Sequence, residues 1–100
     1  MMSLETVQTD AEGYLANRED WSEELAHEIA KQLSVELGDE HWTVLNAARA
    51  IDAESGSSPG LRKISKRSDV PIKAIYKLFP HGPAKAIAKI AGIPKPKSCL

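Results

Sequence analysis

The stretch Leu78–Leu100 reads LFPHGPAKAIAKIAGIPKPKSCL, and the rest of the chain is organised around it. Its middle part, Ala84–Ala91, places small and apolar residues at helical spacing, and Gly92 is suited to end that helix as a C-cap. Further on, Pro94 and Pro96 exclude a regular helix and favour an extended, polyproline-like path. The sequence therefore predicts a packed helix that is followed by a stiff arm.

The arm carries the only cysteine of the chain, Cys99, one residue from the end. The seven steps from Gly92 reach roughly 20 Å at ~3.1 Å per residue. A thiolate can accept a sulfane sulfur and become a persulfide. Lys95 and Lys97 favour the thiolate, whereas the terminal carboxylate opposes it, so the balance stays open. A single thiol forms no internal disulfide, so a sulfur on Cys99 can leave only to another molecule. An exposed terminal cysteine without a role is the alternative.

Length and composition predict one folded domain of an ordinary soluble protein. The chain has 100 residues, of which 42% are hydrophobic and 27% are charged. We expect residues 5–92 to form the folded body and residues 93–100 to form a mobile arm. With no membrane-spanning run and no signal peptide in the sequence, we expect a cytoplasmic protein that makes no membrane contact. Three scattered histidines lack ligand spacing, which indicates no metal site and no other cofactor.

The spacing of apolar residues predicts an α+β domain that is mostly helical. Five segments have helical spacing: Trp21–Leu33, Asp39–Ile51, Leu61–Arg67, Pro71–Phe79 and Ala84–Ala91. We expect Asn17–Asp20 to supply the cap of the first helix and Asp39 that of the second, with Trp21 and Trp42 as core anchors and His41 as a capping or packing residue. Two short extended runs, Glu5–Thr9 and Gly13–Leu15, predict a small N-terminal β-hairpin packed on the bundle of about five helices.

The net charge of −1 conceals two oppositely charged halves. Residues 1–58 hold 13 of the 14 acids and three bases, whereas residues 59–100 hold ten Lys and Arg and one acid, Asp69. The two halves should attract each other in the folded chain. The basic half is either a docking face, for an acidic partner or for tRNA held by a partner, or a solvated surface that the acidic half partly neutralises.

The segment GPAKAIAKIAGIPKPKSC, Gly82–Cys99, resembles the C-terminal signature of the DsrC/TusE family of small sulfur-carrier proteins. Further matches lie upstream in the same order: DAEGYL (Asp10–Leu15), DW (Asp20–Trp21), HW (His41–Trp42), Arg49, Pro59 with Arg62, and LFPHGPAK (Leu78–Lys85). The resemblance covers about 90 residues of the chain.

This resemblance implies roles for individual residues. Cys99 is the implied persulfide-forming nucleophile, on an arm with four docking residues: Pro94, Lys95, Pro96 and Lys97. Arg49 and Arg62 are implied contacts of the arm or of a partner, with a salt bridge to the acidic half as the alternative for Arg49. Family members with a second cysteine carry it at the position of Ala88, so chemistry that links two thiols is not available to this chain.

The one-cysteine pattern is similar to the TusE branch of the family. It implies a carrier-type sulfurtransferase that takes sulfur from a donor complex of the TusBCD or DsrEFH type. The sulfur then passes to an acceptor of the MnmA type, a tRNA thiouridylase, so that tRNA is contacted only indirectly. A DsrC-related role in sulfur oxidation, in sulfite reduction or in their regulation is the alternative within the family.

A different class of function is indicated by the segment Leu61–Phe79, LRKISKRSDVPIKAIYKLF. A basic helix, a short turn and a second helix with aromatic residues are similar to a helix-turn-helix DNA reader. The turn lacks the usual glycine, and the net charge is negative. Such a reader would bind duplex DNA with a steep salt dependence and would not depend on Cys99.

Overall fold

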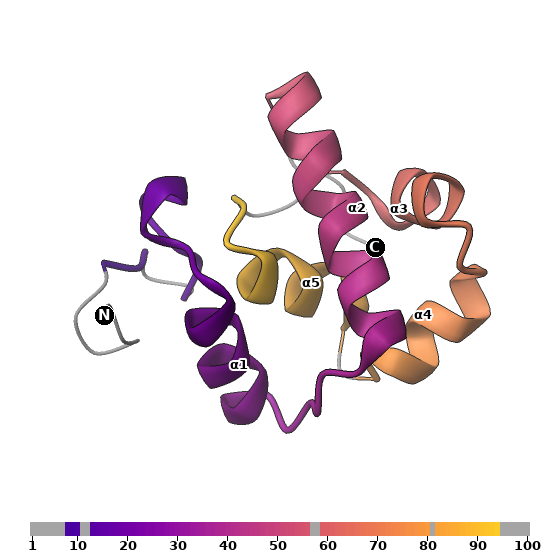
Figure 1. The fold of residues 1–100 in the computed structure, drawn as a ribbon, viewed down its shortest axis with the longest axis horizontal. Helices are drawn as coiled ribbons and strands as arrows, with labels where there is room; N and C mark the ends of the chain where they lie inside the picture. Colours follow the sequence, from indigo (N-terminus) through magenta and orange to yellow (C-terminus); the bar gives the residue numbers. More distant parts are fainter. Residues whose placement is uncertain (1–7, 11–12, 57–58, 81, 95–100) are drawn as a thin grey trace.

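Five α-helices and one 3-10 turn form the chain in a computed structural model that describes residues 8–10, 13–56, 59–80 and 82–94 (Figure 1). The elements are η1 (Arg18–Asp20), α1 (Glu23–Gln32), α2 (Asp39–Ser55), α3 (Leu61–Ser68), α4 (Ile72–Leu78) and α5 (Pro83–Ala91). The prediction of a mostly helical fold with five helices is confirmed. None of the helices in these described ranges is both long and apolar enough to cross a membrane.

Helix α5 lies at the centre of the bundle, between α1 and α2 (Figure 1). Its buried residues are Pro83, Ala84, Ala86, Ile87, Ala88, Ile90 and Ala91. Most of them are small, which allows the neighbouring helices to approach closely and to bury Leu25 and Leu45 in the same core. The helix pair α3–α4 packs against α2 at the other end of the molecule. The element that leads into the arm is therefore also the most enclosed part of the core.

The predicted N-terminal hairpin is not confirmed. The described part of this region holds a single antiparallel bridge between Thr9 and Leu15, and no strand. Around it, the backbone N–H of Asp10 donates to the carbonyl of Tyr14 over 2.8 Å, and that of Ala16 donates to Gln8 over 2.9 Å. The pairing stops there because the chain turns into η1 directly after the bridge. Most of the first expected run, Glu5–Thr9, lies outside the described residues.

Two predicted helix starts are shifted. The cap of α1 is Ser22, whose hydroxyl accepts a hydrogen bond from the N–H of Leu25 over 3.1 Å. The expectation that Asn17–Asp20 cap this helix is wrong, because these residues form their own turn, in which the N–H of Glu19 donates to Oδ1 of Asn17. Helix α2 is capped at Gly38, and Asp39 is its first residue rather than its cap.

His41 both caps and packs, as predicted. Its Nδ1 accepts a hydrogen bond from the N–H of Gly38 over 3.1 Å, and its Nε2 lies 3.0 Å from the carbonyl oxygen of Leu78. Since a carbonyl only accepts, these two contacts assign the ring proton to Nε2. The ring also meets Phe79 edge-on at a centroid distance of 5.1 Å. His41 therefore joins the start of α2 to the end of α4.

Candidate functional site at the base of the arm

Gly92 ends α5 as the sequence predicts, and the next residue, Ile93, is still buried in the core, so the exposed part of the arm begins at Pro94. Gly92 has a φ of 70° in the left-handed region, and its N–H donates to the carbonyl of Lys89 over 3.3 Å. The next N–H, of Ile93, donates to the carbonyl of Ala88 over 3.0 Å. These two bonds form a Schellman cap. They set the direction in which the chain leaves the helix.

Trp21 holds this cap from outside the helix. Its indole Nε1–H donates to the carbonyl of Ile90 over 2.8 Å. The ring lies so close to Gly92 that an added Cβ there would meet Cγ and Cβ of Trp21 at 2.8 and 2.9 Å. Glycine is thus required at position 92 twice, by the positive φ and by the indole. Trp21 is half-buried against the core, as predicted, and it also locks the base of the arm.

Arg49 completes the cap from helix α2. Its guanidinium carbon lies 3.6 Å from the centre of the Trp21 ring, a cation–π stack, and its Nη1–H donates to the carbonyl of Ala91 over 2.8 Å. Burial lowers the pKa of Arg49, and the negative charge of Asp52 opposes this effect.

The end of α5 is therefore fully satisfied. Each of its last four carbonyls, which a helix leaves without a partner of its own, accepts a hydrogen bond. The four acceptors are Ala88, Lys89, Ile90 and Ala91. A cation at this end also complements the helix dipole. We conclude that the base of the arm is a rigid point built from α5, α2 and the residue that precedes α1.

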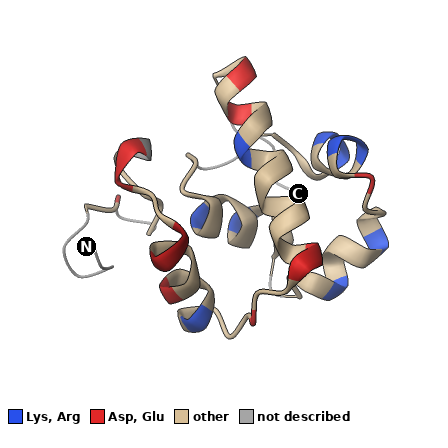
Figure 2. Ribbon diagram, in the orientation of Figure 1, with Lys and Arg blue, Asp and Glu red and all other residues tan. Residues whose placement is uncertain are grey.

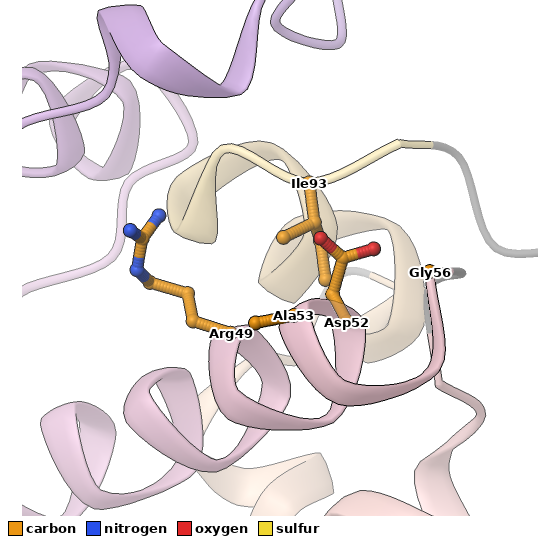
Figure 3. A pocket seen from close by; sticks show the side chains of 5 residues that line it. All are labelled: Arg49, Asp52, Ala53, Gly56 and Ile93. Carbon is orange, nitrogen blue, oxygen red and sulfur yellow. The ribbon is translucent and has the colours of Figure 1, made fainter.

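A cavity of about 280 Å³ lies beside this rigid point. Its lining residues are Arg49, Asp52, Ala53, Gly56 and Ile93 (Figure 3). Asp52 is 3% exposed, and its carboxylate points from α2 toward Ile93, whereas the Arg49 guanidinium extends away from Asp52 to its stack on the Trp21 ring (Figure 3). Ile93 contributes an apolar wall from the first turn beyond α5. The cavity thus has the acidic side chain of Asp52 and the apolar side chain of Ile93 in its walls, where the arm begins.

The structure brings only part of the predicted site together. Arg49 lies at the base of the arm, whereas Arg62 is exposed on α3 and does not line the cavity. Pro94 is exposed and is the last described residue. Four predicted residues lie outside the described ranges: Lys95, Pro96, Lys97 and Cys99. Within the described ranges, no group of three His, Cys, Asp or Glu side chains could hold a metal ion.

Sequence reasoning missed two members of this site, Trp21 and Asp52, and one contact of a third, Gly92. Trp21 was assigned to the core alone, although the Asp20–Trp21 match was a signal for a more specific role. Asp52 follows Arg49 by three residues on the same helix, a spacing that places two side chains on one face. Gly92 was predicted as a cap, but its contact with Trp21 joins residues 71 positions apart in the chain and leaves no periodic signal.

Comparison with known proteins identifies the family of the chain. The family model described as DsrC like protein matches residues 1–100. The chain belongs to the DsrC-like family. A relative from Buchnera aphidicola of Schizaphis graminum, named Sulfurtransferase TusE, is 43% identical over 96% of this chain and 90% of its own length. The protein of the same name from Yersinia pseudotuberculosis is 42% identical over 94% of both chains.

Solved structures of the DsrC-like family have the same fold. The NMR structure of DsrC from Allochromatium vinosum gives a TM-score of 0.80 at 38% identity, with 94% of this chain and 90% of that chain covered. The crystal structure of the oxidized gamma-subunit of the dissimilatory sulfite reductase from Archaeoglobus fulgidus also gives 0.80, at 37% identity, over 94% and 92% of the two chains.

Proposed function

We propose that this chain is a sulfurtransferase of the carrier type, which holds sulfur on Cys99 as a persulfide and relays it in the synthesis of 2-thiouridine in tRNA. Relatives named Sulfurtransferase TusE, 43% and 42% identical over nearly the whole chain, support the activity. The structural observation that carries the proposal is the fully satisfied end of α5. Because this base is rigid, a short arm can hold its thiol at a defined reach outside the folded body.

The transfer is an exchange between sulfur atoms and needs no oxidant. The Cys99 thiolate attacks the terminal sulfur of the donor's persulfide, and the sulfur–sulfur bond of the donor breaks. The donor leaves as a thiolate, and Cys99 becomes a persulfide. A thiolate of the acceptor then attacks the terminal sulfur of Cys99 in the same way. Cys99 returns as a thiolate, so one sulfane sulfur has moved and the arm is ready for another cycle.

The arm residues prepare this exchange without taking part in it. Pro94 and Pro96 restrict the backbone, which lowers the entropy that is lost when the arm enters a partner. Lys95 and Lys97 attract the partner's acidic groups and favour the thiolate. The cavity beside Arg49 lies where the arm begins, because Ile93, the residue before Pro94, lines it.

The family resemblance implies the partners of the relay. The donor is a persulfide-bearing complex of the TusBCD or DsrEFH type, and the acceptor is a tRNA thiouridylase of the MnmA type that holds the tRNA itself. Arg62 is exposed on α3 and is therefore available to a partner. The reducing cytoplasm suits this cycle because it keeps Cys99 from forming stable disulfides.

Intact-protein mass spectrometry without reductant tests the proposal. The chain is incubated with a cysteine desulfurase, free cysteine and a purified TusBCD-type complex. We expect the wild type to gain the mass of one sulfur and Cys99→Ser to gain none, because an alcohol does not form a persulfide. Ser98→Ala is the matched control next to the thiol and should gain sulfur as the wild type does. A wild type that stays unmodified with a competent donor would refute the carrier role.

A DsrC-related role in sulfur oxidation or sulfite reduction is the second candidate, because the solved structures that resemble the chain are DsrC proteins. Measuring 2-thiouridine in the tRNA of a strain that lacks this protein separates the two roles. Loss of the modified base, restored by the wild type and not by Cys99→Ser, supports the tRNA relay. Unchanged 2-thiouridine assigns the carrier to the other pathway.

A further inference from the structure

The helix pair α3–α4 forms a rigid unit with one buried side. Leu61 and Ile64 of α3 and Ile75 of α4 are 3%, 1% and 0% exposed. The turn between the helices is closed by the Ser65 hydroxyl, which donates to the carbonyl of Val70 over 2.7 Å. These buried side chains and this hydrogen bond hold the helix pair in place, and its opposite side faces solvent.

That outer side is strongly basic. Residues 61–80 hold six Lys and Arg and a single acid, Asp69. All six basic side chains are exposed: Arg62, Lys63, Lys66, Arg67, Lys73 and Lys77. Figure 2 shows this concentration on α3 and α4, whereas acidic residues gather on η1, on the start of α1 and at both ends of α2. Arg67 is paired with Glu54 of α2, at 2.9 and 2.6 Å, so the charge at that edge is partly neutralised.

Two large apolar side chains interrupt the basic side. Ile72 is 36% exposed and Tyr76 is 49% exposed, and no other large hydrophobic residue in the described ranges is classed as exposed. They lie four residues apart on α4, so they share one face of the helix. Single exposed apolar residues are ordinary on a protein surface. An aromatic and an aliphatic side chain together, each followed by an exposed lysine, Lys73 and Lys77, have instead the composition of a protein–protein interface with an apolar centre and a polar rim.

We propose that Ile72 and Tyr76, together with the exposed basic residues of the same helix pair, Arg62, Lys63, Lys66, Lys73 and Lys77, form the docking face for an acidic protein surface on the persulfide donor. This face is called the α3–α4 face below, and its assignment to the donor rests on the proposed carrier function. Tyr76 and Ile72 supply the apolar anchor, and the lysines steer the encounter of the two proteins. The arm then only has to reach the donor's sulfur from a body that is already docked.

Two observations favour an acidic protein over a nucleic acid. The apolar pair at the centre of the face has no favourable contact with a phosphate backbone, which is bound by cations and hydrogen-bond donors. The rest of the chain is acidic, with a net charge of −1 overall, and would repel a long polyanion. The donor fits better than the acceptor, because an enzyme that holds tRNA needs a basic surface of its own and would repel the α3–α4 face.

Sulfur transfer measured against donor concentration tests the docking face. The probe is the purified, persulfide-loaded TusBCD-type complex, and the readout is the rate at which Cys99 gains one sulfur. We expect Tyr76→Ala, and separately the double change Lys73→Glu with Lys77→Glu, to raise the donor concentration for half-maximal rate by about tenfold or more. The maximal rate should stay within about twofold, since the thiol and its arm are unchanged.

Three controls separate docking from chemistry and folding. Lys31→Glu reverses one lysine on α1, at the other end of the bundle, which is half the charge change of the double variant, and it should leave the half-maximal donor concentration within about twofold. Persulfidation of Cys99 by inorganic polysulfide should be the same in all variants, because no docking is involved. The melting temperature of Tyr76→Ala should match that of the wild type, since this side chain is half exposed.

The outcomes distinguish this proposal from the carrier role. If the wild type takes sulfur normally and the face variants behave as Lys31→Glu does, the docking face is refuted and the carrier role stands. If the wild type takes no sulfur, the carrier role fails, and direct binding of the unloaded complex to the wild type and to Tyr76→Ala decides the face alone. Variants that keep donor transfer but lose salt-dependent binding of duplex DNA or tRNA would assign the face to nucleic acid and overturn the proposal.

Discussion

Helices α4 and α5 each carry two lysines four residues apart, but the residues that directly precede those lysines differ in size and in burial. In α4 these residues are Ile72 and Tyr76, which are large and exposed. In α5 they are Ala84 and Ala88, which are small and buried, because other helices pack closely over them. Burial in this molecule thus follows position relative to neighbouring helices and not the size of a side chain. The comparison assigns α5 the role of a platform and α4 that of an available surface.

The largest loss of stability is expected from a substitution at the end of α5, the platform of this comparison. We expect Gly92→Ala to lower the free energy of unfolding by about 3 kcal/mol, because the methyl group meets the Trp21 indole and the residue keeps a positive φ. Gly56→Ala is the matched control: it has a similar φ of 77° with nothing within 4 Å of the added Cβ, so it should cost only about 1 kcal/mol. Denaturant unfolding of both variants measures the difference. Equal losses would mean that Trp21 does not clamp position 92.

A smaller loss of stability is expected when Arg49, which holds the end of α5, is changed. Arg49→Lys keeps the charge but loses the planar stack on Trp21 and the directed bond to the Ala91 carbonyl. We expect a loss of about 1–2 kcal/mol in the free energy of unfolding. Arg62→Lys on the exposed α3–α4 face should stay within about 0.5 kcal/mol. A loss in Arg62→Lys equal to that in Arg49→Lys would contradict the distinction between a platform and a free surface.

These differences also show what the sequence could predict. Helical periodicity located all five helices, because Leu25 and Ile29, like Ile87 and Ile90, repeat on one face. The Gly92 cap was predicted from the glycine that precedes an extended, proline-containing run. The hydrogen bond from Trp21 to Ile90 could not be predicted in this way, since 69 residues separate the partners and only tertiary packing brings them together. The position of Arg49 near the arm was implied by family resemblance. The local sequence pattern alone did not distinguish this position from a salt bridge between Arg49 and the acidic half.

The attraction between the two charged halves, expected from their opposite charges, is seen in the ion pair Glu54–Arg67. It joins the acidic end of α2 to the basic helix α3. The hydrogen bonds from Arg67, and then its charge, hold the pKa of Glu54 below its ordinary value of 4.5. A carboxylate whose pKa is lower in the folded state stabilises the fold at pH values above its unfolded-state pKa. This contribution is lost as the pH falls through the lower, folded-state pKa.

The smallest effect is therefore expected from Arg67→Gln, and it should depend on pH. The difference in melting temperature from the wild type should be largest near neutral pH and should shrink as the pH falls below about 4.5 and as salt is added. Arg62→Gln, a neighbouring change without this partner, should show no such trend. The effect stays small because both side chains are exposed, at 46% and 60%, whereas Leu61, Ile64 and Ile75 hold the helix pair from below. A large loss of stability in Arg67→Gln would mean that a surface ion pair, rather than the core, fixes the α3–α4 face in place.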